Sequence, residues 1–175
     1  CFPPGVPRHA VAPASHQILQ TSSYVVHLLE YSHAYRIIPT TAGPHAPSSV
    51  RLWQGDSRGR WEGNTLVVDV TNSNGLAWFD NAGNFVSDAV HVVERFTLID
   101  ADTIHYEARI DDPTVFTRPW TMVSAFRRNK EPGYELLEQA CYEGNRAVEG
   151  AEGVGLKTYQ GVTGILGGNR KKDSR

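Results

Sequence analysis

The fold of this chain is decided by residues 88–99, which read DAVHVVERFTLI. Apolar residues occupy alternate positions here, and β-branched and aromatic side chains favour extended backbone. The stretch therefore predicts a β-strand with one apolar face. That face consists of Val90, Val92, Phe96 and Leu98. Glu94 falls in its middle, where an unpaired carboxylate is costly, so we expect a buried polar site around Glu94.

Residues 116–126 place a cation in the same situation. The apolar face of this second predicted strand is made by Phe116, Trp120, Met122 and Phe126, and Arg118 lies among them. A structural ion pair between Glu94 and Arg118 is one interpretation. The other is an acid with a shifted pKa that faces a pocket.

Strand signals continue along most of the chain. The strands expected along the whole chain, including the two above, are 16–20, 24–31, 34–38, 59–71 as a hairpin, 89–99, 103–111, 115–128 and 134–141. In the strand 103–111, Ile104, Tyr106, Ala108 and Ile110 are expected to face inward. Short turns between consecutive strands favour an antiparallel meander of about eight strands. No stretch predicts a helix longer than two turns. The expected fold is all-β, and we favour a lipocalin-like barrel over a two-sheet sandwich.

Composition favours a single domain. The chain has 175 residues, of which 40% are hydrophobic, and this suits one core. We expect an extended Pro-rich arm over 1–15, one β domain over 16–150 and a flexible, Gly-rich basic tail over 151–175. A formal net charge of -2 gives no broad reason to bind nucleic acid or an anionic membrane. No apolar run is long enough to predict a membrane span.

The two cysteines, Cys1 and Cys141, predict a disulfide that ties the N-terminal arm to the last strand. Two unrelated thiols, or a lipid-anchored Cys1, are the alternatives. The start of the sequence has neither Met nor a signal-like segment, which predicts a processed or trimmed product. Seven histidines are present without a His-x-His or His-x-x-x-His pair, so we expect no metal site and no cofactor.

Polar residues gather around one predicted bend, where Glu30, His33 and Arg36 lie close together in sequence. A carboxylate or an imidazole could transfer a proton there, and a guanidinium could stabilise an oxyanion. A solvated turn held by an ion pair is the alternative.

A second polar group is the predicted loop 55–59, GDSRG, between Trp53 and Trp61. Glycines allow a ligand to approach the backbone, and indole walls suit a sugar or an aromatic ring. The loop offers a carboxylate, a hydroxyl and a forked donor from Asp56, Ser57 and Arg58. Alternatively, the carboxylate and the guanidinium fix the loop to itself. The Gly-x-Ser-x-Gly spelling predicts no nucleophile elbow, because no helix follows it.

Five stretches together resemble a family of exported bacterial proteins that are common in soil acidobacteria and proteobacteria. They are 24–39 (YVVHLLEYSHAYRIIP), 53–69 (WQGDSRGRWEGNTLVVD), 92–96 (VVERF), 111–121 (DDPTVFTRPWT) and 140–145 (ACYEGN). The resemblance covers most of the chain. It implies the C-terminal portion of a longer exported precursor and a periplasmic or secreted location. It implies no reaction, because the motifs of the family carry no assigned activity.

Three functions from different classes fit these observations. The first is an exported, metal-independent lyase, isomerase or hydrolase that acts by general acid–base chemistry on a small cyclic substrate, such as a sugar or an aromatic compound. Its proton-transfer residues would be Glu30, His33, Asp56 and Glu94. Its substrate-binding residues would be Arg36, Trp53, Ser57, Arg58, Trp61, Arg118 and Trp120. The second is a lipocalin-like module that binds a small molecule without turnover. The third is a structural role in which Trp78, Phe79 and the tail contact a partner chain, including a homo-oligomer.

Overall fold

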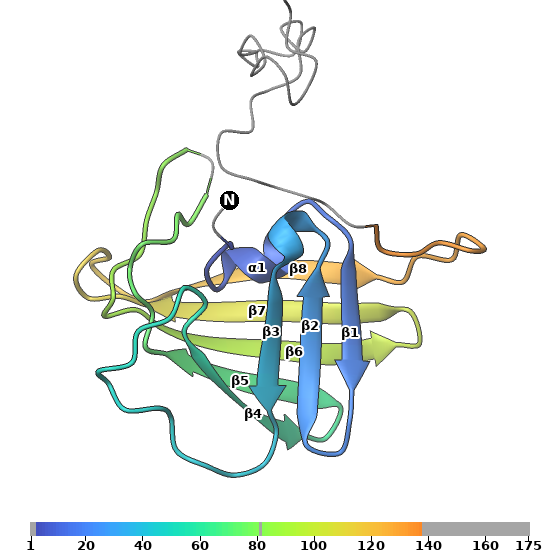
Figure 1. The fold of residues 1–175 in the computed structure, drawn as a ribbon, viewed down its shortest axis with the longest axis horizontal. Helices are drawn as coiled ribbons and strands as arrows, with labels where there is room; N and C mark the ends of the chain where they lie inside the picture. The colour runs from blue at the N-terminus through green and yellow to red at the C-terminus, as the bar shows by residue number, and fades with distance from the viewer. Residues whose placement is uncertain (1–2, 81, 138–175) are drawn as a thin grey trace, which may run out of the picture. The chain divides into compact units, whose positions relative to one another are not determined.

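The computed structural model describes residues 3–80 and 82–137, which form an all-β structure with little helix (Figure 1). A three-stranded antiparallel sheet contains β1 (His16–Gln20), β2 (Tyr24–Leu29) and β3 (Tyr35–Pro39). A five-stranded antiparallel sheet contains β4 (Asp56–Glu62), β5 (Thr65–Thr71), β6 (His91–Asp100), β7 (Thr103–Asp111) and β8 (Trp120–Arg127). Within each sheet the strands are adjacent in chain order, which confirms the predicted antiparallel meander. Cys1, Cys141 and the predicted tail lie outside the described residues.

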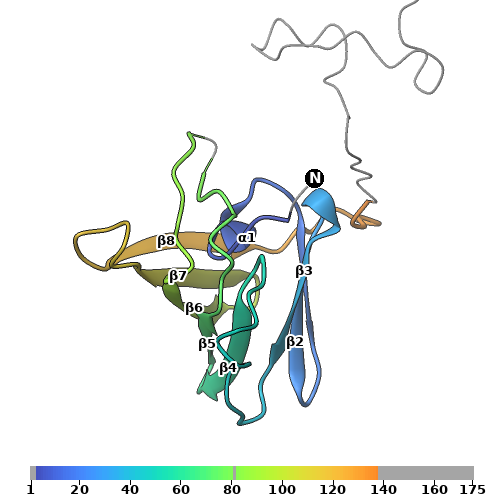
Figure 2. The ribbon, with the colours of Figure 1, turned by 60° about the vertical axis from the view of Figure 1, so that its left-hand side comes forward.

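The two sheets pack face to face, with their strands crossing at a steep angle (Figures 1 and 2). Gly59 on β4 allows one edge of this packing to be close. A Cβ at that position would lie 2.9 Å from Ile38 Cγ2 and 3.3 Å from the carbonyl oxygen of Pro39, both on β3. A side chain there would therefore push β3 away from β4.

The core lies between the sheets and follows the two-residue alternation of the strands. On β7, Tyr106, Ala108 and Ile110 are fully buried, as predicted for their face. They pack with buried residues of both sheets, among them Val25, Ile38, Val68, Val92 and Phe96. Alternation therefore decides which side of each strand is apolar.

The N-terminal segment differs from the predicted extended arm. It contains a short helix, α1 (Arg8–Val11), and buries Val6, His9 and Ala10 against the rest of the core. A second short helix, η1 (Tyr31–His33), joins β2 to β3. None of the helices in residues 3–80 and 82–137 is long and apolar enough to cross a membrane.

Two predicted strands are wrong in extent. β8 begins at Trp120 instead of residue 115, because Asp112 organises a turn before it. The backbone N–H groups of Val115 and Phe116 donate to the carbonyl oxygen of Asp112, at 3.1 and 2.8 Å. The described part of the predicted strand 134–141, residues 134–137, is not a strand.

Candidate functional site

Glu94 is fully buried, as its place on β6 predicts, and its partner is Arg36 on β3. Two nitrogens of the guanidinium donate to the two carboxylate oxygens, at 3.1 and 2.6 Å. The Tyr106 hydroxyl donates to Glu94 Oε1 at 2.8 Å, and Arg36 Nη2 donates to Ser57 Oγ at 3.0 Å. We call these four residues the ionic layer. Because Arg36 and Glu94 come from different sheets, the layer ties the sheets together.

Arg118 is not the partner of Glu94, so the predicted pair is wrong. Its side chain is exposed in the loop between β7 and β8. The turn built on Asp112 removes Arg118 from the alternating pattern of β8, so the pattern no longer directs its side chain inward. Arg36 takes its place because alternation on β3 buries Arg36 and Ile38 together.

Three histidines extend this polar interior beside the ionic layer. His27 on β2 lies across from Arg36 on β3 in the strand register. His27 Nε2 is 2.9 Å from Nδ1 of His16 on β1, and the ring centroids of His27 and His9 are 4.6 Å apart. His9 from α1 also receives a hydrogen bond at 2.9 Å from Gln54. We call His9, His16 and His27 the histidine cluster.

Burial keeps the histidine cluster neutral. Desolvation, followed by the charge of Arg36 and by His16, lowers the pKa of His9 from 6.5 to about 3. The carbonyl of His27 offsets part of this effect, although no group in the described part of the chain meets His9 Nε2 in hydrogen-bond geometry. Burial likewise lowers the pKa of His16, and burial with neighbouring charge lowers that of His27 well below 6.5. The rings therefore carry no charge near neutral pH.

An apolar pocket of about 230 Å³ lies between the sheets next to His27. It is lined by Ile18, Gln20, Val25, His27, Ile38, Trp61, Asn64, Leu66, Phe96, Leu98 and Ile104. Trp61 is 45% exposed at its edge, while Val25, His27 and Ile38 are buried. Among these lining residues, His27 is the one histidine, and its lowered pKa keeps the ring neutral near neutral pH. The pocket is therefore a hydrophobic cavity with very few polar groups.

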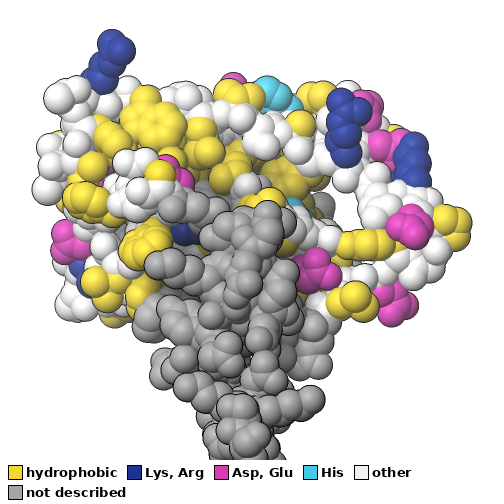
Figure 3. All heavy atoms as spheres, turned by 90° about the horizontal axis from the view of Figure 1, so that it is seen from above, with side chains coloured by type: hydrophobic (Ala, Val, Ile, Leu, Met, Phe, Trp, Pro, Cys, Tyr) yellow, Lys and Arg dark blue, Asp and Glu magenta, His cyan; other side chains and the backbone are white. Residues whose placement is uncertain are grey.

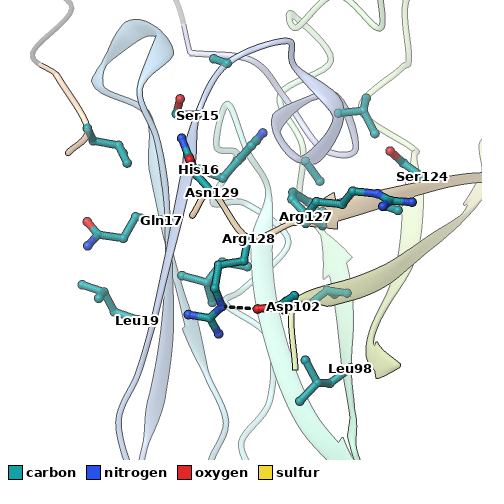
Figure 4. Close-up of a pocket in the computed structure, with 18 of the residues that line it drawn as sticks. Ser15, His16, Gln17, Leu19, Leu98, Asp102, Ser124, Arg127, Arg128 and Asn129 are labelled. Atoms are coloured by element: carbon teal, nitrogen blue, oxygen red, sulfur yellow. Dashed lines mark ion pairs between the residues drawn. The ribbon is translucent and has the colours of Figure 1, made fainter. Parts of the chain in front are cut away.

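A wider edge cleft of about 840 Å³ opens beside the apolar pocket, between β1 and β8 (Figure 4). The two cavities share the lining residues Ile18, Gln20, Leu98 and Ile104. The cleft is also lined by His16, and the ion pair between Arg128 and Asp102, at 3.2 Å, lies in it (Figure 4). The shared residues therefore lie at the boundary between the cleft and the apolar pocket.

Asp56 and Arg58 lie on β4, a strand at a place where we expected a loop. Their side chains are on the face of the five-stranded sheet opposite to the one that carries Ser57 and the ionic layer. Asp56 accepts from Arg58, from the N–H of Ala46 at 3.0 Å and from His45 Nδ1 at 2.7 Å. His45 Nε2 is 2.8 Å from Asp69, which is also 2.8 Å from His91 Nε2. We call Asp56, Arg58, His45, Asp69 and His91 the outer-face network.

The two carboxylates of the outer-face network remain ionised. Burial by itself would raise the pKa of Asp56, but the Ala46 N–H, His45 and Arg58 together lower it. For Asp69 burial acts in the same direction and is outweighed by His91 and His45. A general base works best with a pKa near the operating pH, so these lowered values disfavour Asp56 in proton transfer.

Four of the predicted site residues line a surface hollow of about 490 Å³ beside β3 and β4, which we call the seam hollow. They are Arg36, Trp53, Asp56 and Ser57. Glu30 is elsewhere, where its carboxylate accepts from the Leu137 N–H at 3.1 Å. The side chain of His33 is outside the described part of the chain. The structure therefore brings Arg36 next to Ser57, from the second predicted polar group, and not next to Glu30, with which the sequence had grouped it.

Trp120 is partly buried and packs edge-on against Phe79 and Phe116 on a side of the core away from the apolar pocket. Its indole Nε1 is buried and has no hydrogen-bond partner among the residues that the structure describes. Within residues 3–80 and 82–137, no group of three or more His, Cys, Asp or Glu side chains is placed to hold a metal ion.

The histidine cluster was missed from the sequence. His27 alternates with Val25 and Leu29, and this is the buried face of β2, but the intervening Val26 and Leu28 are also apolar. The pattern thus could not choose a face. His9 and His16 carry no such signal, because a helix and an edge strand bring them to His27.

Comparison of the chain with protein-family models, curated proteins and solved structures finds no match in any of the three.

Proposed function

We propose that this chain is a binding module that holds a small apolar molecule in the apolar pocket, without converting it. The observation that carries the proposal is a hydrophobic cavity between the two sheets which, among the residues that the structure describes, is lined by one histidine, His27, and by no carboxylate, lysine or arginine. Ligand sites are mostly apolar cavities with a few placed polar groups, and this cavity has that character. Its volume of about 230 Å³ suits a molecule with one or two rings.

A lipocalin-like open barrel is the form of the fold that we propose for this function. The close approach of β3 to β4 at Gly59, and the edge cleft between β1 and β8, support a barrel closed on one side and open on the other. The ligand would enter through the edge cleft. The resemblance to exported bacterial proteins supports a periplasmic or secreted location.

The second candidate is the acid–base enzyme, and the seam hollow is the observation that favours it. Trp53, Asp56 and Ser57 share that hollow with a cation, Arg36. The state of the two candidate carboxylates argues against this enzyme. Glu94 is fully buried and accepts three hydrogen bonds, and Asp56 has a lowered pKa, so neither carboxylate is prepared to exchange a proton with a substrate.

Filling the apolar pocket tests the binding proposal. Ile104 lines both the pocket and the cleft, so Ile104→Trp should occupy the space of a ligand. Ile99 is 59% exposed on β6 and lines neither cavity, so Ile99→Trp is the matched control. Naphthalene is a suitable apolar probe, measured by equilibrium dialysis.

We expect wild type and Ile99→Trp to bind naphthalene alike, and Ile104→Trp to bind it at least about tenfold more weakly. Absence of binding to the folded wild type, or equal binding by both variants, would overturn the proposal. Turnover of a sugar or aromatic substrate that is lost in Ser57→Ala would favour the enzyme instead.

A further inference from the structure

The apolar pocket has a buried floor and an exposed mouth. Its floor includes Val25, Ile38 and Phe96, which are buried. Ile18 is 37% exposed and Leu98 is 48% exposed, so these two lining residues are at the mouth. Both of them also line the edge cleft. A molecule in the pocket that reaches this part of the mouth therefore presents one end to solvent in the edge cleft.

A charged turn lies next to the mouth. Leu98 on β6 and Ile104 on β7 are paired in the strand register, and both line the pocket. The turn between these two strands carries Asp102, which lines the edge cleft and is drawn with its partner Arg128 above Leu98 (Figure 4). Asp102 precedes Ile104 by two residues, and a strand rises about 3.3 Å per residue, so the turn lies about 7 Å beyond the Leu98–Ile104 pair.

Positive charge is in excess at this turn, among the residues that the structure describes. The Asp102 carboxylate is paired with two cations, Arg128 Nε at 3.2 Å and Lys130 Nζ at 2.5 Å. Arg127 and Asp100 line the same exposed hollow as these three residues. Three cations therefore share two carboxylates, which leaves one positive charge in excess.

An anionic group in the edge cleft could reach these cations. The side chains of Arg128 and Lys130 are 66% and 68% exposed, whereas that of Asp102 is 39% exposed. Arg127 and Arg128 line the cleft, where Asp102 is the one carboxylate within the described residues. His16 also lines it and adds no charge near neutral pH, because burial lowers its pKa. Binding an anion here needs little desolvation, because the cations remain in contact with water.

From this geometry we infer that the ligand of the apolar pocket is an anionic amphiphile, with its apolar part in the pocket and a carboxylate in the edge cleft beside Arg128. The inference rests on the proposed binding function and specifies its ligand. The pocket itself disfavours charge, because no Asp, Glu, Lys or Arg among the described residues lines it and burying an isolated charge is costly. The pocket and the cleft therefore favour the two different ends of one molecule.

Three linear probes of equal chain length test this inference: decanoate, decan-1-ol and decylamine, which carry a negative charge, no charge and a positive charge. Each competes with naphthalene in equilibrium dialysis, so displacement of naphthalene reports occupation of the pocket. Wild type should bind decanoate at least about threefold more tightly than decan-1-ol, and decylamine more weakly than both. The preference should shrink in about 1 M salt, because the cations are exposed.

The outcomes separate the inference from the binding function. If naphthalene binds but decanoate does not displace it, or if decan-1-ol or decylamine binds as tightly as decanoate, the inference is overturned and the binding function stands. If neither naphthalene nor any of the three probes binds, the proposed function is removed as well.

Two variants of the turn should act in opposite directions. Arg128→Gln removes the excess charge, so the preference for decanoate over decan-1-ol should disappear. Asp102→Asn removes the carboxylate that competes for Arg128 and Lys130, so decanoate should bind at least about twofold more tightly than to wild type. Both variants should bind decan-1-ol within about twofold of wild type. Changes of the same sign in decanoate affinity would show that the turn acts through packing, and would contradict the inference.

Arg109→Gln is the matched control. Arg109 also forms an exposed ion pair, with Asp111 at 3.5 Å, but it lines neither cavity. This variant should keep the preference of wild type for decanoate. An equal loss of preference in Arg109→Gln and Arg128→Gln would mean that decanoate responds to the net charge of the protein and not to the charged turn.

Discussion

Glu94 and His91 lie on the same strand, three residues apart, and face opposite sides of the five-stranded sheet. Glu94 is fully buried between the sheets with Arg36, whereas the side chain of His91 is 43% exposed beside Asp69. Both belong to networks of charged and polar side chains joined by short contacts. The two networks differ in their exposure to water, and this exposure determines how much each network contributes to the free energy of unfolding.

The ionic layer is satisfied on nearly every side, but water cannot replace a missing partner in it. The outer-face network can be repaired by water, because each of its members is partly exposed. The network has a local role: His45 bonds to both Asp56 and Asp69, which fixes the segment between β3 and β4 on the outer side of the sheet. Both of its ring nitrogens face carboxylates, and both can donate only in the imidazolium form.

The largest expected effect comes from removing the cation of the ionic layer. Arg36→Met leaves the Glu94 carboxylate buried without its partner, and we expect a loss of about 3–5 kcal/mol in the free energy of unfolding. Urea denaturation measures it. The control is Arg95→Met, which breaks a half-exposed pair with Glu62 (3.1 Å) and should cost less than about 1 kcal/mol. Similar losses in the two variants would contradict the contrast between the faces.

Replacing both partners sharpens that result. In the double variant Arg36→Met with Glu94→Leu, no charge is left buried, so much of the loss should be recovered. The Tyr106 hydroxyl would then lack its acceptor, which keeps the recovery incomplete. If the double variant were as unstable as the single one, packing rather than charge would explain the effect.

As the pH falls, titration of the histidine cluster should lower the free energy of unfolding before titration of Asp56 and Asp69 in the outer-face network does. The folded pKa of His9 is about 3 and its unfolded value is 6.5, so the unfolded chain binds more protons between these values. Stability is therefore complete above about pH 6.5 and falls as the pH decreases, by up to about 1.4 kcal/mol per pH unit for each such histidine. The lowered pKa values of Asp56 and Asp69 add a loss only below about pH 3.8.

Urea midpoints at about pH 7.5 and about pH 5, at constant ionic strength, measure this dependence. His9→Gln removes one of the groups and should reduce the difference between the two midpoints. A midpoint that is independent of pH in this window would show that the histidine cluster is hydrated and titrates normally.

Breaking the outer-face network should have a smaller effect. His45→Ala removes the link between Asp56 and Asp69, and we expect a loss of about 1 kcal/mol, because the freed carboxylates can be hydrated. The loss should shrink in about 1 M salt, whereas that of Arg36→Met should not, since buried pairs are screened less. Chemical denaturation at low and high salt separates the two, and equal salt dependence would count against this interpretation.

Arg118→Ala should have the smallest effect. The side chain is exposed in the β7–β8 loop, so its removal should change the free energy of unfolding by no more than about 0.5 kcal/mol. A loss comparable to that of Arg36→Met would restore the pair first expected with Glu94. Ligand affinity measured on the same variant provides a second check, and we expect no change.

Exposed apolar side chains at one end of the molecule stand apart from both regions. Leu76, Trp78 and Phe85 are each more than half exposed in the long connection between β5 and β6. Hydrophobic side chains are visible at several places on the surface of the described residues when the molecule is seen from above (Figure 3). Contact of Trp78 with a partner chain remains a prediction from the sequence, and Phe79 differs because it packs on Trp120.

Much of the fold could be predicted because strand signals are local. Residues 103–111 were expected as a strand with Ile104, Tyr106, Ala108 and Ile110 inward, and β7 has these bounds and this face. The hairpin at Gly63, where φ is +61°, follows from a residue without a Cβ. The start of β8 was not predictable from alternation, because the turn on Asp112 depends on Ser87, whose N–H and hydroxyl donate to the Asp112 carboxylate from far along the chain.

The sequence by itself determined most of the strands, their order and the burial of Glu94, because two-residue alternation on an extended backbone places every second side chain on the same face. Only the tertiary structure decided that Arg36 is the partner of Glu94 and that His9 and His16 meet His27. Those contacts join residues from separate strands and a helix, and their geometry depends on how the two sheets cross. The residue pattern within a single strand contains no information about that crossing, so the apolar pocket and the histidine cluster form only when the sheets are packed.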